Sequence, residues 1–134
     1  MNKPKIFSFP VRVYYQDTDA GGVVYHANYV NFMERARTEW LRTFGHSNAD
    51  MVKELGMMFV VRSLKLDYLK PALLDDLLTV TAQIKDIGRS RVTLLQTVSR
   101  GEELLTEGEV HLVCVTADRF KPVSVPDVLR VQWS

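Results

Sequence analysis

The chain has 134 residues, of which 46% are hydrophobic and 25% charged, a composition typical of one globular domain and unlike that of a disordered chain. Seventeen Lys and Arg against sixteen Asp and Glu leave a net charge of +1, so overall charge gives no support for nucleic-acid binding. We therefore expect a single domain over residues 1–134 with no nucleic-acid partner.

The cysteine count and the N-terminal residues indicate the cellular compartment. Cys114 is the only cysteine, which excludes an internal disulfide, and no Cys/His cluster has zinc-ligand spacing. The first residues carry lysines but lack the apolar core of a signal peptide. The longest charge-free run, 20–33, contains Gly, His and Asn and does not predict a membrane span. We expect a cytoplasmic protein with no metal and no integral membrane segment.

The first predicted element is a strand. Apolar and polar side chains alternate from Phe7 to Tyr15, which indicates a strand with one buried face. Pro10 has no N–H to donate to a neighbouring strand, so this strand should lie at a sheet edge or break there.

The pattern then changes from period two to helical spacing. Apolar residues recur at steps of three and four: Tyr29, Phe32, Met33, Ala36, Trp40 and Phe44. This predicts a helix of about four turns with Asn28 as its N-cap and Gly45 as its stop. On the charged face, Arg35 and Glu39 should pair. A shorter helix is expected over 50–55, ending at Gly56.

Four β-rich runs follow, separated by short breaks that suit hairpins. The runs cover about 58–68, 78–85, 92–99 and 104–116. A strand, a long helix and four successive strands predict an α+β domain, with five antiparallel strands curved around one helix. Because one helix covers only one face of the sheet, we expect an oligomer.

The segment between the first strand and the helix has the composition of a reactive site. Asp17 and Asp19 follow the strand, Gly22 lets backbone approach a ligand, and free N–H groups begin the helix near His26. A carboxylate beside such an oxyanion site is the minimum for hydrolysis of a carbonyl substrate. The alternatives are that Asp19 merely stabilises a turn, or that the D-x-D pair binds a metal, for which no further oxygen ligands are evident.

Two runs, VRVYYQDTDAGGVVYHANYVNFMERAR at 11–37 and FVVRSLKLDYLKPALLDDLLTV at 59–80, resemble the 4-hydroxybenzoyl-CoA thioesterase family, especially its YbgC-type acyl-CoA thioesterases. The resemblance implies the hotdog fold, a five-stranded antiparallel sheet wrapped around one long helix. It implies that Asp19 is the essential carboxylate and that the backbone N–H of His26 polarises the thioester carbonyl. It also implies that Tyr25 and Tyr29 line the acyl pocket, and that active sites form across a dimer interface. From its position, Asp17 is expected to hold the loop that presents Asp19.

Several roles stay open at this level. The His26 ring could be a general acid or base, or could only shape the pocket. Asp19 could act as nucleophile or as general base. Glu34 lies on the same predicted helix as His26, and such a pair would suit a hotdog dehydratase; the alternative is an ion pair with Arg37 or Arg35. Cys114 alternates as a strand residue without a base to activate it.

The predicted hairpin at 85–91 contains Arg89, Ser90 and Arg91, side chains that bind phosphate well. The resemblance implies that this turn contributes to coenzyme A recognition; the alternative is ordinary solvated charge. The sequence thus favours an acyl-CoA thioesterase that releases free acid and coenzyme A without cofactor, as a homodimer or homotetramer. The alternatives are a 3-hydroxyacyl thioester dehydratase and a non-catalytic module that binds acyl-CoA or acyl carrier protein.

Overall fold

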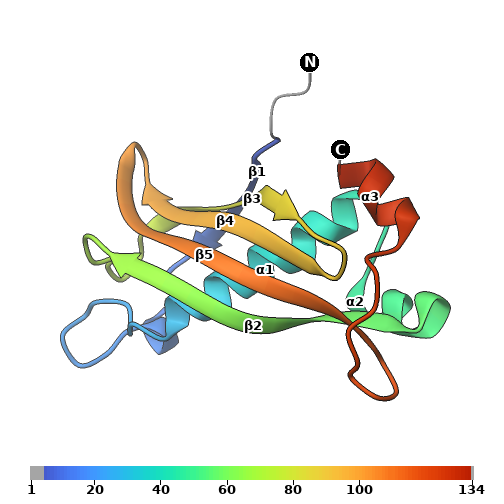
Figure 1. Ribbon diagram of the computed structural model, residues 1–134. Coiled ribbons are helices and arrows are strands. Elements are labelled where there is room, and N and C mark those ends of the chain that lie inside the picture. The colour runs from blue at the N-terminus through green and yellow to red at the C-terminus, as the bar shows by residue number, and fades with distance from the viewer. Residues whose placement is uncertain (1–4, 134) are drawn as a thin grey trace.

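The computed structural model describes residues 5–133, and it confirms the predicted sheet wrapped around a helix (Figure 1). Five antiparallel strands form one sheet in the order β1-β3-β4-β5-β2. The elements are β1 (Phe7–Arg12), α1 (Asn28–Thr43), α2 (Asn48–Asp50), β2 (Met57–Tyr68), β3 (Leu77–Ile87), β4 (Arg91–Arg100), β5 (Glu103–Thr116) and α3 (Asp127–Trp133).

The two edges of the sheet differ. β1 is an edge strand, as Pro10 predicts. It ends at Arg12, and residues 15–17 form a short 3₁₀ turn instead of extending the strand. The opposite edge is β2, a strand of 12 residues that pairs only with β5 and has an irregularity between Val61 and Ser63. A long unpaired edge of this kind offers hydrogen-bonding groups to another strand.

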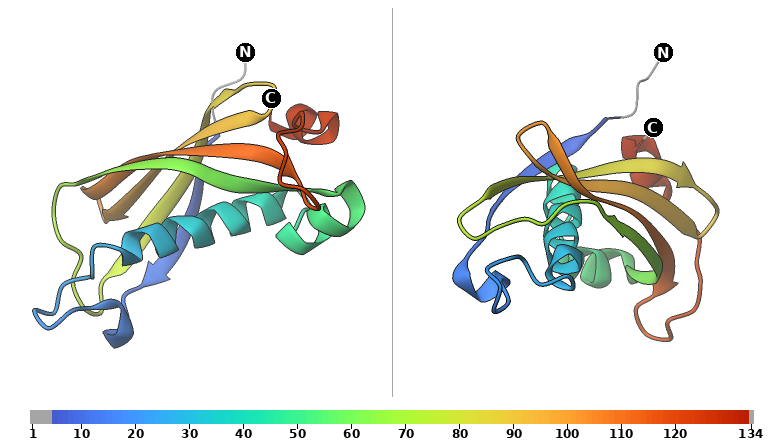
Figure 2. Two further views of the ribbon diagram at one scale, coloured as in Figure 1. Left: turned by 60° about the horizontal axis from the view of Figure 1, so that its bottom comes forward. Right: turned by 90° about the vertical axis from the view of Figure 1, so that its left-hand side faces the viewer.

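The core lies between α1 and the concave face of the sheet (Figure 2). The predicted stripe is the buried face of α1, where Phe32, Met33 and Ala36 are fully enclosed. Burying a side chain such as Phe or Met stabilises the fold by about 1.5–3 kcal/mol relative to leaving it exposed. The helix therefore sits on the sheet through its apolar stripe.

The ends of α1 match the prediction only at the C-terminus. Gly45 adopts a φ of +86° just beyond the helix and ends it as expected. The predicted N-cap is wrong: Ala27 occupies the cap position, and Asn28 is the first helical residue. The Asn28 side chain is engaged by other side chains instead: its oxygen accepts from the Asn31 amide at 3.0 Å, and its nitrogen donates to the Asp17 carboxylate at 2.9 Å.

The predicted ion pair on the charged face of α1 is also wrong. Glu39 pairs with Arg42 at 3.4 Å, and Arg35 instead lies over the ring of Phe32, 5.9 Å from its centroid. Both partners of the observed pair are largely exposed, so it contributes little to stability.

The C-terminal part of the chain holds an element that periodicity does not predict. Helix α3 packs beside the C-terminal half of α1, where Trp133 stacks on Trp40 with ring centroids 5.0 Å apart. Near it, the predicted short helix is present as α2 followed by a wider π-helical turn, which ends at Gly56 with a φ of +64°. Among residues 5–133, no helix is long and apolar enough to cross a membrane.

We predict that Gly108→Ala destabilises the protein by about 1–3 kcal/mol, because β5 has no room for a side chain there. An added Cβ would overlap the Leu66 side chain and lie 3.2 Å from the Lys65 carbonyl oxygen and 3.4 Å from the Met33 side chain. Denaturant unfolding of the variant measures the loss.

The control is Glu107→Ala at the neighbouring exposed position, which should change the unfolding free energy by less than about 0.5 kcal/mol. Equal midpoints for the two variants would contradict tight packing at Gly108.

Candidate active site

The loop from Thr18 to His26 folds back on itself in a tight turn. The Asp19 N–H donates to the Val23 carbonyl at 2.9 Å, and the Gly22 N–H donates to the Asp19 carbonyl at 3.1 Å. Gly22 has a φ of +79°, a conformation that strongly favours glycine. The second glycine of the segment is thus needed to form the turn that carries Asp19.

Asp17 ties this loop to both neighbouring elements. Its side chain is buried and accepts hydrogen bonds from the Tyr14 N–H at 2.8 Å and the Asn28 amide at 2.9 Å. Its backbone carbonyl accepts from the Tyr25 N–H at 2.9 Å. These contacts confirm the expected structural role of Asp17.

Asp19 lies in the opposite environment. Its side chain is exposed, and one carboxylate oxygen accepts from the Gly21 N–H at 2.8 Å. Within the described residues it forms no ion pair and its other oxygen has no hydrogen-bond donor. The turn therefore orients Asp19 while leaving one oxygen open to a substrate or a water molecule.

The start of α1 supplies backbone donors near this loop. Along residues 5–133, the N–H groups of His26 and Ala27, which lie directly before the first residue of α1, find no acceptor. The His26 carbonyl is fixed by the Tyr68 hydroxyl, which donates to it at 2.8 Å, and the Tyr25 ring lies 4.4 Å from the imidazole. Free N–H groups in this position suit a developing oxyanion.

A cavity of about 280 Å³ opens beside the helix start, lined by Val24, His26, Tyr29, Tyr68, Leu69, Lys70 and Pro71. Tyr29 is buried in its wall and its hydroxyl accepts from the Ala72 N–H at 3.0 Å. Burial raises the pKa of Tyr29 and of Tyr68, so both phenols stay protonated at neutral pH. Tyr25, in contrast, is half exposed beside His26.

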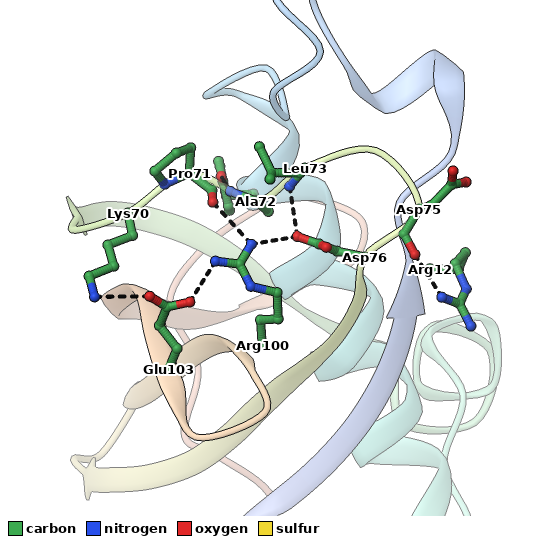
Figure 3. A network of polar contacts seen from close by, with 10 residues as sticks. Arg12, Lys70, Pro71, Ala72, Leu73, Asp75, Asp76, Arg100 and Glu103 are labelled. Atoms are coloured by element: carbon green, nitrogen blue, oxygen red, sulfur yellow. Dashed lines mark hydrogen bonds and ion pairs between the residues drawn. The ribbon is translucent and has the colours of Figure 1, made fainter.

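An ionic network holds the far wall of this cavity, the loop at 69–76 (Figure 3). Arg100 on β4 donates to Asp76 at 2.6 Å and also pairs with Glu103, which pairs in turn with Lys70 at 2.9 Å. The hydrogen bonds from Lys70 and then Arg100 lower the pKa of Glu103 below its usual range. The cavity wall is thereby fixed to β4 and β5.

The predicted phosphate-binding residues lie elsewhere in the chain. Arg89, Ser90 and Arg91 form the turn between β3 and β4, and both arginine residues are exposed. This hairpin lies near α3 and the C-terminal half of α1, whereas the loop of Asp19 lies at the N-terminal end (Figure 1). A helix of 16 residues is about 24 Å long, so one chain does not bring the two sets together.

The residues considered for dehydration line different cavities, and the one considered for thiol chemistry stays protonated. Glu34 and Arg37 line a second cavity of about 280 Å³, and His26 does not. The expected ion pair of Glu34 is absent from the described residues, and Arg37 donates to Gln96 at 2.9 Å instead. Burial raises the pKa of Cys114 to about 11, so this thiol stays protonated at neutral pH. Over residues 5–133, no group of three His, Cys, Asp or Glu is arranged to hold a metal ion.

The comparisons with known proteins identify the family of the chain. Residues 21–107 match the model of the Thioesterase superfamily. The chain belongs to the thioesterase superfamily. It is 46% identical to "Acyl-CoA thioesterase YbgC" of Haemophilus influenzae over 95% of this chain and 93% of that protein. It is 48% identical to "Acyl-CoA thioester hydrolase YbgC" of Escherichia coli over 96% of each.

Solved structures of the superfamily share the fold. A probable thioesterase from Bartonella henselae superposes with a TM-score of 0.87 at 34% identity, covering 91% of this chain and all of that one. A hypothetical protein from Aquifex aeolicus superposes with a TM-score of 0.88 at 27% identity, covering 96% of this chain and 99% of that one. Together with the family match, these structures confirm the hotdog fold that the sequence resemblance implies. Sequence reasoning did not identify Tyr68 or the ionic network of Arg100 as parts of the site. The one signal in the sequence is that Tyr68 comes shortly before the break at Pro71, because β2 ends at Tyr68.

Proposed function

We propose that the protein hydrolyses acyl-CoA thioesters to a free acid and coenzyme A, with Asp19 and the N-terminus of α1 as its catalytic groups. The observation that supports this most is the pairing of an exposed, oriented carboxylate with unbonded N–H groups at His26 and Ala27. The relatives named as acyl-CoA thioesterases supply the substrate class.

The reaction follows from these groups. In the general-base route, Asp19 removes a proton from water, the oxygen attacks the thioester carbon, and the oxyanion is stabilised by the N–H of His26. The C–S bond then breaks and coenzyme A leaves as a thiolate that takes up the proton. In the nucleophilic route, Asp19 attacks the thioester carbon and expels coenzyme A as a thiolate, and water then hydrolyses the mixed anhydride. Label found in Asp19 after a single turnover in ¹⁸O-water identifies the nucleophilic route, because water never bonds the Asp19 carboxyl carbon in the general-base route.

Asp19→Asn should lower kcat by about 10²–10⁴ while the protein stays folded. The amide oxygen of Asn can still accept the hydrogen bond from Gly21, so the turn is retained and only the charge is lost. Release of free thiol from a panel of acyl-CoA esters measures the effect.

Asp118→Asn is the matched control, because Asp118 lies exposed in the loop after β5 and should keep full activity. Turnover of folded Asp19→Asn at the rate of this control would remove Asp19 from the mechanism.

The Gly22 backbone, Tyr25 and Tyr29 complete the proposed substrate site around the thioester. The Gly22 turn brings backbone close to the bound group, and the half-exposed Tyr25 shields it beside His26. Tyr29 shapes the cavity wall through its buried ring. The His26 ring lines the same cavity and contributes shape, while its backbone N–H provides the charge stabilisation.

The hairpin of Arg89, Ser90 and Arg91 is the proposed site for the phosphates of coenzyme A. Two exposed guanidinium groups and a hydroxyl at one turn suit several phosphate oxygens at once. These contacts lie far from the reacting carbon, so they should stabilise bound substrate and transition state equally.

Replacing both Arg89 and Arg91 by Ala should raise KM for acyl-CoA esters with little change in kcat. Added salt should weaken binding by the parent protein more than by the double variant, because the lost contacts are ionic. Steady-state kinetics at two ionic strengths test this, and an unchanged KM and salt response would mean that the hairpin is only solvated surface.

A two-fold dimer across β2 would unite the two parts of the site. β2 runs antiparallel to α1, and two β2 edges pair antiparallel about a two-fold axis. The two α1 helices then run in opposite directions, which brings the hairpin of one protomer toward the Asp19 loop of its partner. The exposed edge and its exposed Val61 support this proposal. Pairing of two such dimers would give a tetramer.

Val61→Asp should therefore weaken the dimer and lower activity per chain, because a charge is buried at the paired edge. Sedimentation velocity alongside activity across a dilution series checks this, and the parent protein should also lose activity per chain as it dissociates. A fully active monomer at assay concentration would overturn both the dimer and the shared site.

Two other activities are distinguished by products. A dehydratase would release no free thiol, and a non-catalytic module would bind acyl-CoA or acyl carrier protein without turnover. The separation of Glu34 from the cavity of His26 favours hydrolysis over dehydration. Comparing acyl-CoA with acylated carrier protein as substrate tests the second partner.

We place this activity in the cytoplasm, where a single unpaired thiol such as Cys114 is stable.

A further inference from the structure

Arg130 on α3 connects the C-terminal helix to the β3–β4 hairpin. Its guanidinium donates to the carbonyl oxygens of Gly88 and Arg89, both at 2.7 Å, and its Nε donates to the Val125 carbonyl at 3.2 Å. One planar side chain thus bonds its own segment at Val125 and a turn that lies 41 and 42 residues before it in the chain. Such a fork of donors is specific to arginine, because lysine presents a single ammonium group.

Hydrogen bonds from Arg130 and from backbone N–H groups together fix the direction of every backbone carbonyl in the turn. Arg89 O also accepts from the Val125 N–H at 2.8 Å, and Ser90 O accepts from the Cys114 N–H at 2.7 Å. Arg91 O accepts from the Gly88 N–H at 2.7 Å. Over the described part of the chain, the N–H groups of Arg89 and Ser90 have no acceptor. The turn therefore has its acceptors engaged by protein and its donors left for a ligand.

This polarity matters for an anion. A carbonyl oxygen carries partial negative charge and repels phosphate, whereas free backbone N–H groups attract it. Without Arg130, the Gly88 carbonyl would lose its donor and be free to turn outward, and the Arg89 carbonyl would keep only the Val125 N–H. The buried Leu129 and the stacked Trp133 hold α3 in place, so Arg130 acts from a fixed support.

We propose that Arg130 is a positioning residue for coenzyme A: it orients the hairpin so that the donors of Arg89 and Ser90 face the nucleotide phosphates. This inference rests on the proposed function of the hairpin. It assigns α3 a part in substrate affinity, although α3 itself contributes no group to the reacting carbon. The ligand chemistry is a phosphate-bearing nucleotide attached to the leaving thiol.

The test compares two substrates with the same acyl group, one a coenzyme A ester and the other its N-acetylcysteamine thioester, which lacks the nucleotide and phosphates. Arg130→Met should raise KM for the coenzyme A ester roughly tenfold, the size expected for loss of charge-assisted hydrogen bonds. Its kcat, and its kcat/KM for the short thioester, should match the parent protein. Arg42→Met on α1 removes an equal charge that pairs with Glu39 and not with the hairpin backbone, and it should change neither value.

The outcomes separate this inference from the proposed function. If Arg130→Met leaves KM unchanged while the double variant at Arg89 and Arg91 raises it, only the role of Arg130 fails. If neither changes KM, the hairpin site itself is wrong. Equal loss toward both substrates would show a merely structural role and overturn the inference. Should Arg130→Met not fold, Arg130→Lys serves instead: a smaller rise in KM confined to the coenzyme A ester supports positioning, and a parental KM refutes it.

Discussion

The buried carboxylate of Asp17 fixes the relation between the sheet and the start of α1, and the geometry of the proposed active site depends on that relation. Its two oxygens bond a backbone N–H before the loop and the Asn28 amide at the first helical residue. Hydrogen bonds to a carboxylate are stronger than those between neutral groups, and burial makes their loss costly. The loop between these anchors consequently has little freedom, and Asp19 is carried in a defined place.

Two aspartates, two residues apart, therefore have different tasks because their surroundings differ. Asp17 uses both oxygens on protein donors and is enclosed, whereas Asp19 uses one oxygen on the Gly21 N–H and is exposed. A 3₁₀ turn ends at Asp17 and the chain reverses from Asp19 to Val23, so the two side chains lie in different local structures. A site built this way needs no additional structural residue, since the turn that exposes Asp19 is closed by backbone bonds and Gly22.

The sequence alone predicts the parts of the fold that depend on hydrophobic period: the stripe of α1, the five strands, the edge position of Pro10 and the stop at Gly45. It fails where a side chain has a competing partner that the pattern does not rank. Asn28 has the composition of an N-cap but bonds Asp17, and Glu39 has two arginines within reach along the helix. α3 is too short for a period to be visible, and its stability comes from aromatic packing on Trp40.

The same reasoning explains why the site is only half visible in the sequence. Asp19 and His26 are close in the chain, so their motif can be read directly. The hairpin and α3 are far from this motif in the sequence and would reach it only across the proposed dimer. Tyr68, fixed to the His26 carbonyl, comes from the end of β2, and the same strand forms the free edge. Pairing at that edge would place α1 of the partner alongside. In the proposed dimer, the strand that closes one cavity would also determine which neighbour completes it, and affinity for the leaving group would be linked to assembly through β2.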